Sequence, residues 1–223
     1  MSAKTAALLG ATGMIGTYLL DQLVDDPYFD TIRVVVRRPF HNEHARVETK
    51  LVDFNDYESL KLAIDGSDVV FCAIGTTQKK VKGDNALYRK IDLDIPAKAA
   101  RICKETGCKK FVIVSSVGAN TLSSNFYLKL KGEMEAVIEQ TGLESIHIMQ
   151  PSMLLGDRKE NRPAEKFMQK SMKLFGFIFS GSLRKYKSIE AKVVAAAMLN
   201  AAKTDQRGVF RYTYNEIVAM AAL

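Results

Sequence analysis

The stretch Gly10-Ala11-Thr12-Gly13-Met14-Ile15-Gly16 decides the fold of this 223-residue chain. It follows a short apolar run, Thr5–Leu9, and precedes apolar residues at helical spacing up to about Val24, so it joins a predicted strand to a predicted helix. The first glycines let the backbone turn tightly and approach a pyrophosphate, and the last lets helix and strand pack closely. N–H groups at the helix N-terminus would bind the anion. An ordinary turn is the alternative, but glycines placed between these two elements favour a dinucleotide site.

Strand and helix patterns alternate over the following residues. Further short apolar runs predict strands at 32–36, 47–52, 69–74, 110–114 and 145–149. Helical patterns occupy 57–64, 86–105 and 126–140. This alternation is typical of right-handed βαβ units, and it predicts the α/β class with a Rossmann-type, doubly wound parallel sheet.

The regular alternation of strand and helix patterns ends after Pro151. Helical patterns are then found at 163–176, 189–202 and 215–222, with one more strand at 209–213. We therefore expect one domain over residues 1–223, with a dinucleotide-binding core at about 1–150 and a small C-terminal cap at about 151–223.

The end of the second predicted strand indicates which dinucleotide binds. A site for NAD places an acid there for the ribose 2′-hydroxyl, whereas NADP needs cations for its 2′-phosphate. The strand ends Val36-Arg37-Arg38-Pro39, without an acid in reach. Because guanidinium donors match phosphate geometry, Arg37 and Arg38 favour NADP(H), with a solvated pair of loop arginines as the alternative. Asp53, after the third strand, could accept from the adenine amino group or serve as a turn residue, and Gly75 ends the fourth strand near the expected cofactor.

A candidate proton-transfer pair follows the fifth predicted strand. Tyr127 and Lys131 stand four residues apart in a predicted helix, so both project from one face. A lysine beside a tyrosine lowers the pKa of the phenol and makes it a usable acid and base near neutral pH. Ser115 and Ser116 close the strand, where a hydroxyl could hold a substrate carbonyl. Strand alternation puts the two serines on opposite faces, and we slightly prefer Ser116.

Taken together, these motifs resemble the short-chain dehydrogenase/reductase superfamily, specifically its atypical NADP-binding branch and the family of the mammalian Tat-interacting oxidoreductase. The residues that carry the resemblance are Gly10–Gly16, Arg37-Arg38, Gly75-Thr76-Thr77, Ser115-Ser116, Ser123–Tyr127, Lys131-Gly132-Glu133, Leu154–Arg158 and Arg162-Pro163.

The resemblance implies a role for each matching residue. Thr12, Gly13, Met14 and Ile15, within the loop from Gly10 to Gly16, would contact the dinucleotide phosphates, and Arg37 and Arg38 the 2′-phosphate. Ile74 and Gly75 would flank the cofactor. Tyr127 would be the proton donor with Lys131 as its partner. Leu154 and Arg162 would line the nicotinamide or substrate end.

Two departures from the family pattern leave the function open. Asp92 stands where superfamily members often carry an asparagine that completes a proton relay, and Gln150 replaces an arginine of the relatives. The first hypothesis is an NADP-dependent oxidoreductase that transfers hydride between nicotinamide and a carbonyl or alcohol carbon. The second is an NADPH-binding regulatory or scaffold protein with vestigial catalytic residues. The third is a sugar-nucleotide epimerase or dehydratase, for which the C-terminal portion is short.

The composition and the charge distribution limit the kinds of partner that we expect this protein to bind. The net charge of +7 comes mainly from residues 76–131, with 12 basic and 4 acidic groups, and 157–187, with 9 and 3. No nucleic-acid motif and no tryptophan accompany this charge, so we expect a small-molecule substrate and no nucleic acid. The three cysteines and three histidines lack a metal-ligand spacing, so no metal is expected. No signal peptide or membrane span is expected, and we predict a cytosolic monomer or homodimer.

Overall fold

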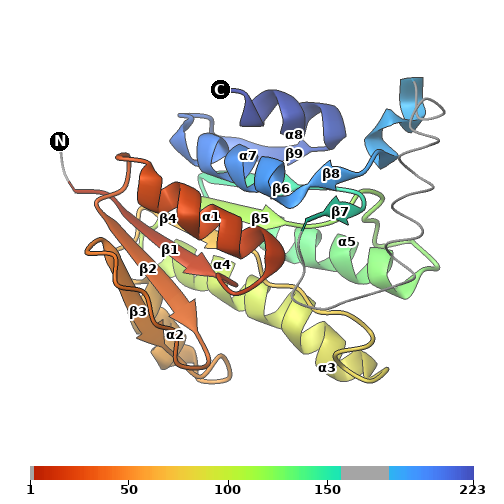
Figure 1. Ribbon diagram of the computed structural model, residues 1–223. Helices are drawn as coiled ribbons and strands as arrows, with labels where there is room; N and C mark the ends of the chain where they lie inside the picture. The colour runs from red at the N-terminus through yellow and green to blue at the C-terminus, as the bar shows by residue number, and fades with distance from the viewer. Residues whose placement is uncertain (1–2, 157–180) are drawn as a thin grey trace.

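The computed structural model describes residues 3–156 and 181–223. A seven-stranded sheet in the order β3-β2-β1-β4-β5-β6-β9, with all neighbours parallel, runs through the middle of the molecule (Figure 1). Its strands are β1 (Thr5–Leu9), β2 (Thr31–Val36), β3 (Val47–Leu51), β4 (Val69–Cys72), β5 (Lys110–Val114), β6 (Ser145–Met149) and β9 (Gly208–Tyr212). The predicted α/β class and doubly wound parallel sheet are confirmed.

Helices cover both faces of the sheet. The main ones are α1 (Met14–Asp25), α2 (Tyr57–Ile64), α3 (Asn85–Arg89), α4 (Ile95–Glu105), α5 (Phe126–Glu139), α7 (Ala191–Lys203) and α8 (Tyr214–Ala221). Alternate residues of β1 enter different cores: Ala6 and Leu8 pack with α1 and α7, whereas Ala7 and Leu9 pack with α2, α4 and α5. Burial on both faces explains why the central strands β1 and β4 are almost continuously apolar, whereas the edge strand β3 carries Glu48, Thr49 and Lys50.

The helix expected at 86–105 is divided by a π-helical turn. Lys90–Asp94 connects α3 to α4, and the N–H of Ile95 donates to the carbonyl of Lys90, five residues back. Pro96 follows, and its ring both lacks an N–H and clashes with the carbonyl four residues earlier, that of Asp92. The proline therefore accounts for the wider turn, which contains Asp92.

The C-terminal part of the chain completes the sheet. β9 pairs with β6, with His147 opposite Phe210, and α7 lies against α1 on the same face (Figure 1). The expected division near residue 150 therefore assigned β9 and α7 to a cap although they belong to the main layers. A smaller pair, β7 (Leu154–Leu155) with β8 (Ile189–Glu190), lies near the carboxyl ends of the main strands and was not predicted. The helix expected at 163–176 lies outside the described residues.

Candidate functional site

A cavity of about 580 Å³ opens at the carboxyl ends of the central strands. Ligands of doubly wound sheets bind at this edge, where the chain crosses from one side of the sheet to the other. Its lining includes ten of the residues expected from sequence or resemblance, which are Thr12, Gly13, Met14, Ile15, Ile74, Gly75, Ser115, Tyr127, Lys131 and Leu154. It also includes Thr76, Thr77 and Lys80, together with Asp92, the residue that stands where superfamily members often carry an asparagine.

The glycine loop has the close packing that its sequence predicts. Gly10 has a φ of +89°, and a Cβ there would lie 2.6 Å from the carbonyl carbon of Ala73. A Cβ on Gly16 would overlap the carbonyl oxygen of Gly10. The helix can therefore approach the strand this closely only if residue 16 is glycine. Gly13 caps α1 without a side-chain hydrogen bond, and the first turn carries no acid. The loop therefore presents backbone N–H groups and no competing carboxylate, which suits a phosphate.

Lys131 is held in the cavity by a buried ion pair. Its Nζ lies 2.9 Å from Oδ1 of Asp92, and the two side chains are only 4% and 2% exposed. The other carboxylate oxygen of Asp92 accepts the N–H of Thr76 at 2.8 Å. Burial disfavours the charged form of the ammonium, but Asp92 and Tyr127 outweigh it, and the pKa of Lys131 is raised. Lys131 is therefore a fixed cation in the cavity wall.

Tyr127 lies one helical turn before Lys131, and both line the same cavity. Its ring is half-buried, 6.4 Å between centroids from the ring of Tyr88. The hydroxyl of Tyr88 donates to the carbonyl of Thr76 at 3.4 Å, so its ring is held against the same wall. Burial raises the pKa of Tyr88, which does not line the cavity, whereas Tyr127 lines it together with Lys131.

The two serines after β5 lie in different surroundings. Ser115 is buried and lines the cavity, and its hydroxyl is hydrogen-bonded to Glu135. Ser116 does not line the cavity, and its hydroxyl donates to the carbonyl of Val117 at 3.4 Å. Ser115 continues the alternation of Ile113, which packs on the side of α4 and α5. The structure therefore differs from the preference for Ser116, because α5 lies on the Ser115 side.

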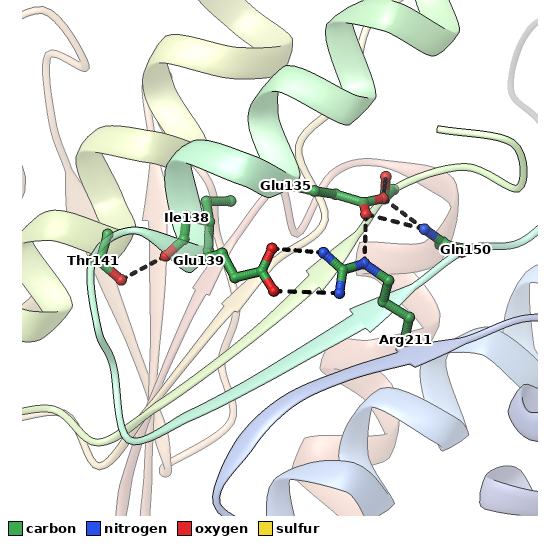
Figure 2. A network of polar contacts seen from close by, with 7 residues as sticks. Glu135, Ile138, Glu139, Thr141, Gln150 and Arg211 are labelled. Atoms are coloured by element: carbon green, nitrogen blue, oxygen red, sulfur yellow. Dashed lines mark hydrogen bonds and ion pairs between the residues drawn. The ribbon is translucent and has the colours of Figure 1, made fainter. Parts of the chain in front are cut away.

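Glu135 is a polar residue of this region that the sequence reading missed. Its carboxylate is 5% exposed and contacts Arg211 and Gln150 (Figure 2), and it also accepts from the hydroxyl of Ser115. Gln150, identified above as a departure from the family pattern, is thus a buried donor to a carboxylate. The available signal was spacing, because Glu135 repeats the four-residue interval that separates Tyr127 from Lys131.

Three other predicted cofactor residues, Arg37, Arg38 and Asp53, are not part of the cavity lining. Arg37 and Arg38 follow β2 and are exposed, and within the described part of the chain their side chains have no hydrogen bond or ion pair. Asp53 accepts from the backbone N–H and the side-chain amide of Asn55, at 2.8 and 2.7 Å, as a turn residue does. Arg162 lies outside the described residues. Among residues 3–156 and 181–223, no three His, Cys, Asp or Glu side chains form a group that could hold a metal ion.

The chain belongs to the NAD(P)H-binding family, whose model matches residues 10–205. It is 34% identical over 203 residues to Protein HTATIP2 of Rattus norvegicus, which covers 90% of this chain and 81% of that protein. It is also 32% identical over 201 residues to Protein fmp52, mitochondrial, of Aspergillus fumigatus, which covers 87% and 85%. The resemblance to the atypical short-chain dehydrogenase/reductases and the Tat-interacting group is confirmed.

The expected cytosolic location is contradicted by these relatives. The fungal proteins of Aspergillus fumigatus and Candida albicans, the latter 37% identical over 158 residues and 69% of each chain, are named mitochondrial. The expectation rested on the absence of an apolar segment, which does not report on import into an organelle. Among the described helices, none has the length and apolar character that crossing a membrane requires.

Solved structures share the fold. The UDP-Glc/GlcNAc 4-epimerase of Campylobacter jejuni has a TM-score of 0.72 at 13% identity, covering 97% of this chain and 82% of that one. MoeE5 in complex with UDP-glucuronic acid and NAD has a TM-score of 0.71 at 16% identity, covering 98% and 81%. At these identities the likeness concerns the fold alone.

Proposed function

We propose that this protein is an NADP-dependent oxidoreductase that transfers hydride between nicotinamide and a carbonyl or alcohol carbon of a small molecule. The observation that carries the proposal is one cavity that brings the glycine loop, Tyr127 and Lys131 together. An uncapped helix N-terminus at one end suits a phosphate, and a phenol beside a fixed ammonium suits proton transfer.

The residues present fit NADP(H). The loop at Gly10, Gly13 and Gly16 would hold a phosphate against backbone N–H groups, and side chains at the first and last of these positions would clash with backbone. Thr12, Met14 and Ile15 line the same part of the cavity, and Ile74, Gly75 and Leu154 line its other walls. Arg37 and Arg38 are exposed at the carboxyl end of β2, where they would hold the 2′-phosphate, and Asp53 would lie near the adenine.

NADP(H), when bound, supplies the hydride chemistry, and the chain supplies position and a proton. Tyr127 would give the proton of its hydroxyl to the substrate oxygen and recover it from solvent. The charge of Lys131, which Asp92 holds in place at 2.9 Å, would stabilise the negative charge that develops on the Tyr127 oxygen as the proton leaves. The ammonium has three hydrogens, so it can bind Asp92 and still donate to a ribose hydroxyl.

Cofactor preference gives the first test. Thermal unfolding should shift upward with NADPH and much less with NADH at equal concentration, because only NADPH carries the phosphate for Arg37 and Arg38. Equal shifts would contradict the NADP assignment, and no shift with either would contradict cofactor binding itself.

An NADPH-binding regulatory protein is a second candidate, favoured by the engagement of two expected catalytic groups. Lys131 is paired with Asp92, and the hydroxyl of Ser115 is bonded to Glu135. A panel of aldehydes, ketones and alcohols separates the two candidates. Turnover of any member supports the oxidoreductase, whereas NADPH binding without turnover across the panel supports the regulatory protein.

A further inference from the structure

Glu135 is a buried carboxylate on α5 that the proposed function does not use. It follows Lys131 by one helical turn and Tyr127 by two, and its side chain is 5% exposed. Figure 2 shows its carboxylate pointing toward Gln150 and Arg211. Because an ionised carboxylate is costly to bury unless it is paired and hydrogen-bonded, the partners of Glu135 determine its state.

Two of these partners donate hydrogen bonds to it. Nε2 of Gln150 lies 2.9 Å from Oε1 and 3.0 Å from Oε2 of Glu135, and Nε of Arg211 lies 3.0 Å from Oε2. The guanidinium also donates to Glu139 at 2.7 Å, and that bond is the main cause that raises the pKa of Arg211. With a cation and an amide donating to both of its oxygens, Glu135 is an ionised acceptor.

The hydrogen bond between Ser115 and Glu135 can therefore run in one direction only. An ionised carboxylate carries no hydrogen, so the hydroxyl of Ser115 donates its only hydrogen to Oε1. Ser115 also lines the cavity, and with its hydrogen directed to Glu135 the hydroxyl can offer a ligand there only lone pairs. A carbonyl oxygen needs a donor, so Ser115 is not suited to hold one.

We propose that Glu135 is a positioning residue that makes Ser115 a hydrogen-bond acceptor, and that the ligand group beside Ser115 is an N–H or O–H donor. This inference rests on the proposed function, because it concerns the ligands of the same cavity. The carboxamide N–H groups of nicotinamide and a hydroxyl of the substrate share this chemistry. The reacting carbonyl oxygen then takes its hydrogen bond from Tyr127.

The cofactor as the source of the donor is tested with NADP⁺ and its 3-acetylpyridine analogue, in which a methyl group replaces the carboxamide nitrogen. We expect wild-type protein to bind NADP⁺ about fivefold more tightly than the analogue, because one net hydrogen bond contributes about that factor to affinity. Ser115→Ala should bring the ratio of the two dissociation constants close to one. Glu135→Gln should do the same, because Arg211 keeps the amide oxygen on its side and the amide nitrogen then donates to Ser115.

The substrate as the source is tested on the NADPH-loaded protein with cyclohexanol and methoxycyclohexane, neither of which can accept a hydride. If the donor belongs to the substrate, cyclohexanol should bind about fivefold more tightly than methoxycyclohexane, and the two cofactors should bind equally well. The same two substitutions should remove this preference for cyclohexanol.

Glu139→Gln is the matched control, because it changes the other carboxylate of Arg211 on the same helix without contacting Ser115. It should leave both ratios unchanged, and the double variant of Ser115 and Glu135 should match each single one. A purely structural role for Glu135 would weaken all ligands together and leave the ratios as in wild type. Ratios of dissociation constants near one in the wild type would overturn this inference but not the proposed function. Wild-type ratios that stay unchanged after either substitution would do the same. Failure to bind NADP⁺ at all would overturn the proposed function and this inference with it.

Discussion

Lys131 and Asp92 form an ion pair at 2.9 Å in which both side chains are almost wholly buried. The pair joins the middle of α5 to the π-helical turn before α4, two elements that lie side by side at the cavity. Because Asp92 also accepts the N–H of Thr76, it connects the residues after β4 to the same point. One carboxylate thus fixes three segments of the cavity wall.

Replacing Asp92 with asparagine should destabilise the protein strongly. The amide oxygen can still accept from Thr76, but the ammonium of Lys131 is left buried without its counter-ion, at a cost of about 3–5 kcal/mol. Urea denaturation measures the loss. Glu190→Gln, which breaks an exposed pair with Lys192, is the control and should change the free energy of unfolding by less than about 1 kcal/mol. Similar losses in the two variants would contradict a structural ion pair at Asp92.

Tyr127→Phe should separate chemistry from binding. We expect kcat on any substrate found in the panel to fall by about 10²–10⁴-fold, because the proton donor is removed. NADPH affinity should change little, since the ring and its packing remain. Tyr57→Phe removes a hydroxyl that donates to Glu105, and since neither residue lines the cavity, this change should leave turnover unchanged. Undiminished turnover in the Tyr127 variant would remove this residue from the mechanism.

The arginines after β2 should act on NADPH alone. Arg37→Ala and Arg38→Ala should each weaken NADPH binding by about tenfold or more, the worth of a charged hydrogen bond, and leave NADH binding unchanged. Isothermal titration gives both affinities. Arg101→Ala, which removes an exposed cation from α4, provides the comparison for a general loss of positive charge. A parallel loss for NADPH and NADH would mean that the two arginines do not recognise the 2′-phosphate.

Gly16→Ala should disrupt the junction of β1 and α1. The added methyl overlaps the carbonyl of Gly10, so the helix must move, at a cost of about 1–3 kcal/mol or more. Gly75→Ala is the matched control for folding, since its Cβ would meet only Asp92 Oδ1 at 3.6 Å. Thermal unfolding compares the two. Equal melting temperatures would show that the close approach at Gly16 does not limit the fold.

His147 should make stability depend on pH below neutrality. Burial, and to a lesser extent the charge of Lys110, lower the pKa of His147 to about 4. Folded protein therefore keeps this residue neutral, whereas unfolded chains take up a proton below a pKa of about 6.5. Its contribution is complete above pH 6.5 and falls by up to about 3 kcal/mol as the pH approaches 4.

Urea denaturation at several pH values measures this slope, and His147→Gln should flatten it. The hydrogen bonds of the imidazole to Tyr212 at 2.8 Å and Ser145 at 3.0 Å are lost in that variant, so its stability is lower at pH 8. An unchanged slope would assign the pH dependence to other groups.

Local patterns were enough to predict the sheet and the phosphate loop. The central strands β1 and β4 are almost wholly apolar because both of their faces are covered, and the glycines between β1 and α1 form a recognisable motif of seven residues. These signals lie within short windows, so they can be read without knowing the tertiary structure. The π-helical turn follows from Pro96, but its consequence for Asp92 depends on where α5 packs.

The wall around Ser115 could not be predicted in the same way. Which serine faces the cavity depends on the side of the sheet that α5 covers, and Glu135 meets Arg211 across 76 residues of sequence. Assignment of β9 to a cap failed for a related reason, because the pairing partner of a last strand is decided by the edge left open in the sheet. Contacts between distant segments carry no periodic signal.

The position of β9 also has a consequence for how the protein is made. The ribosome delivers this strand after the six others of the sheet, and Arg211 on β9 is the cation paired with buried Glu135. A nascent chain that has emerged only as far as β6 leaves one sheet edge open and that carboxylate without its guanidinium. The cavity wall beside Ser115 is therefore completed last. A chain released or cleaved before β9 would contain the phosphate loop but lack the ion pair between Arg211 and Glu135.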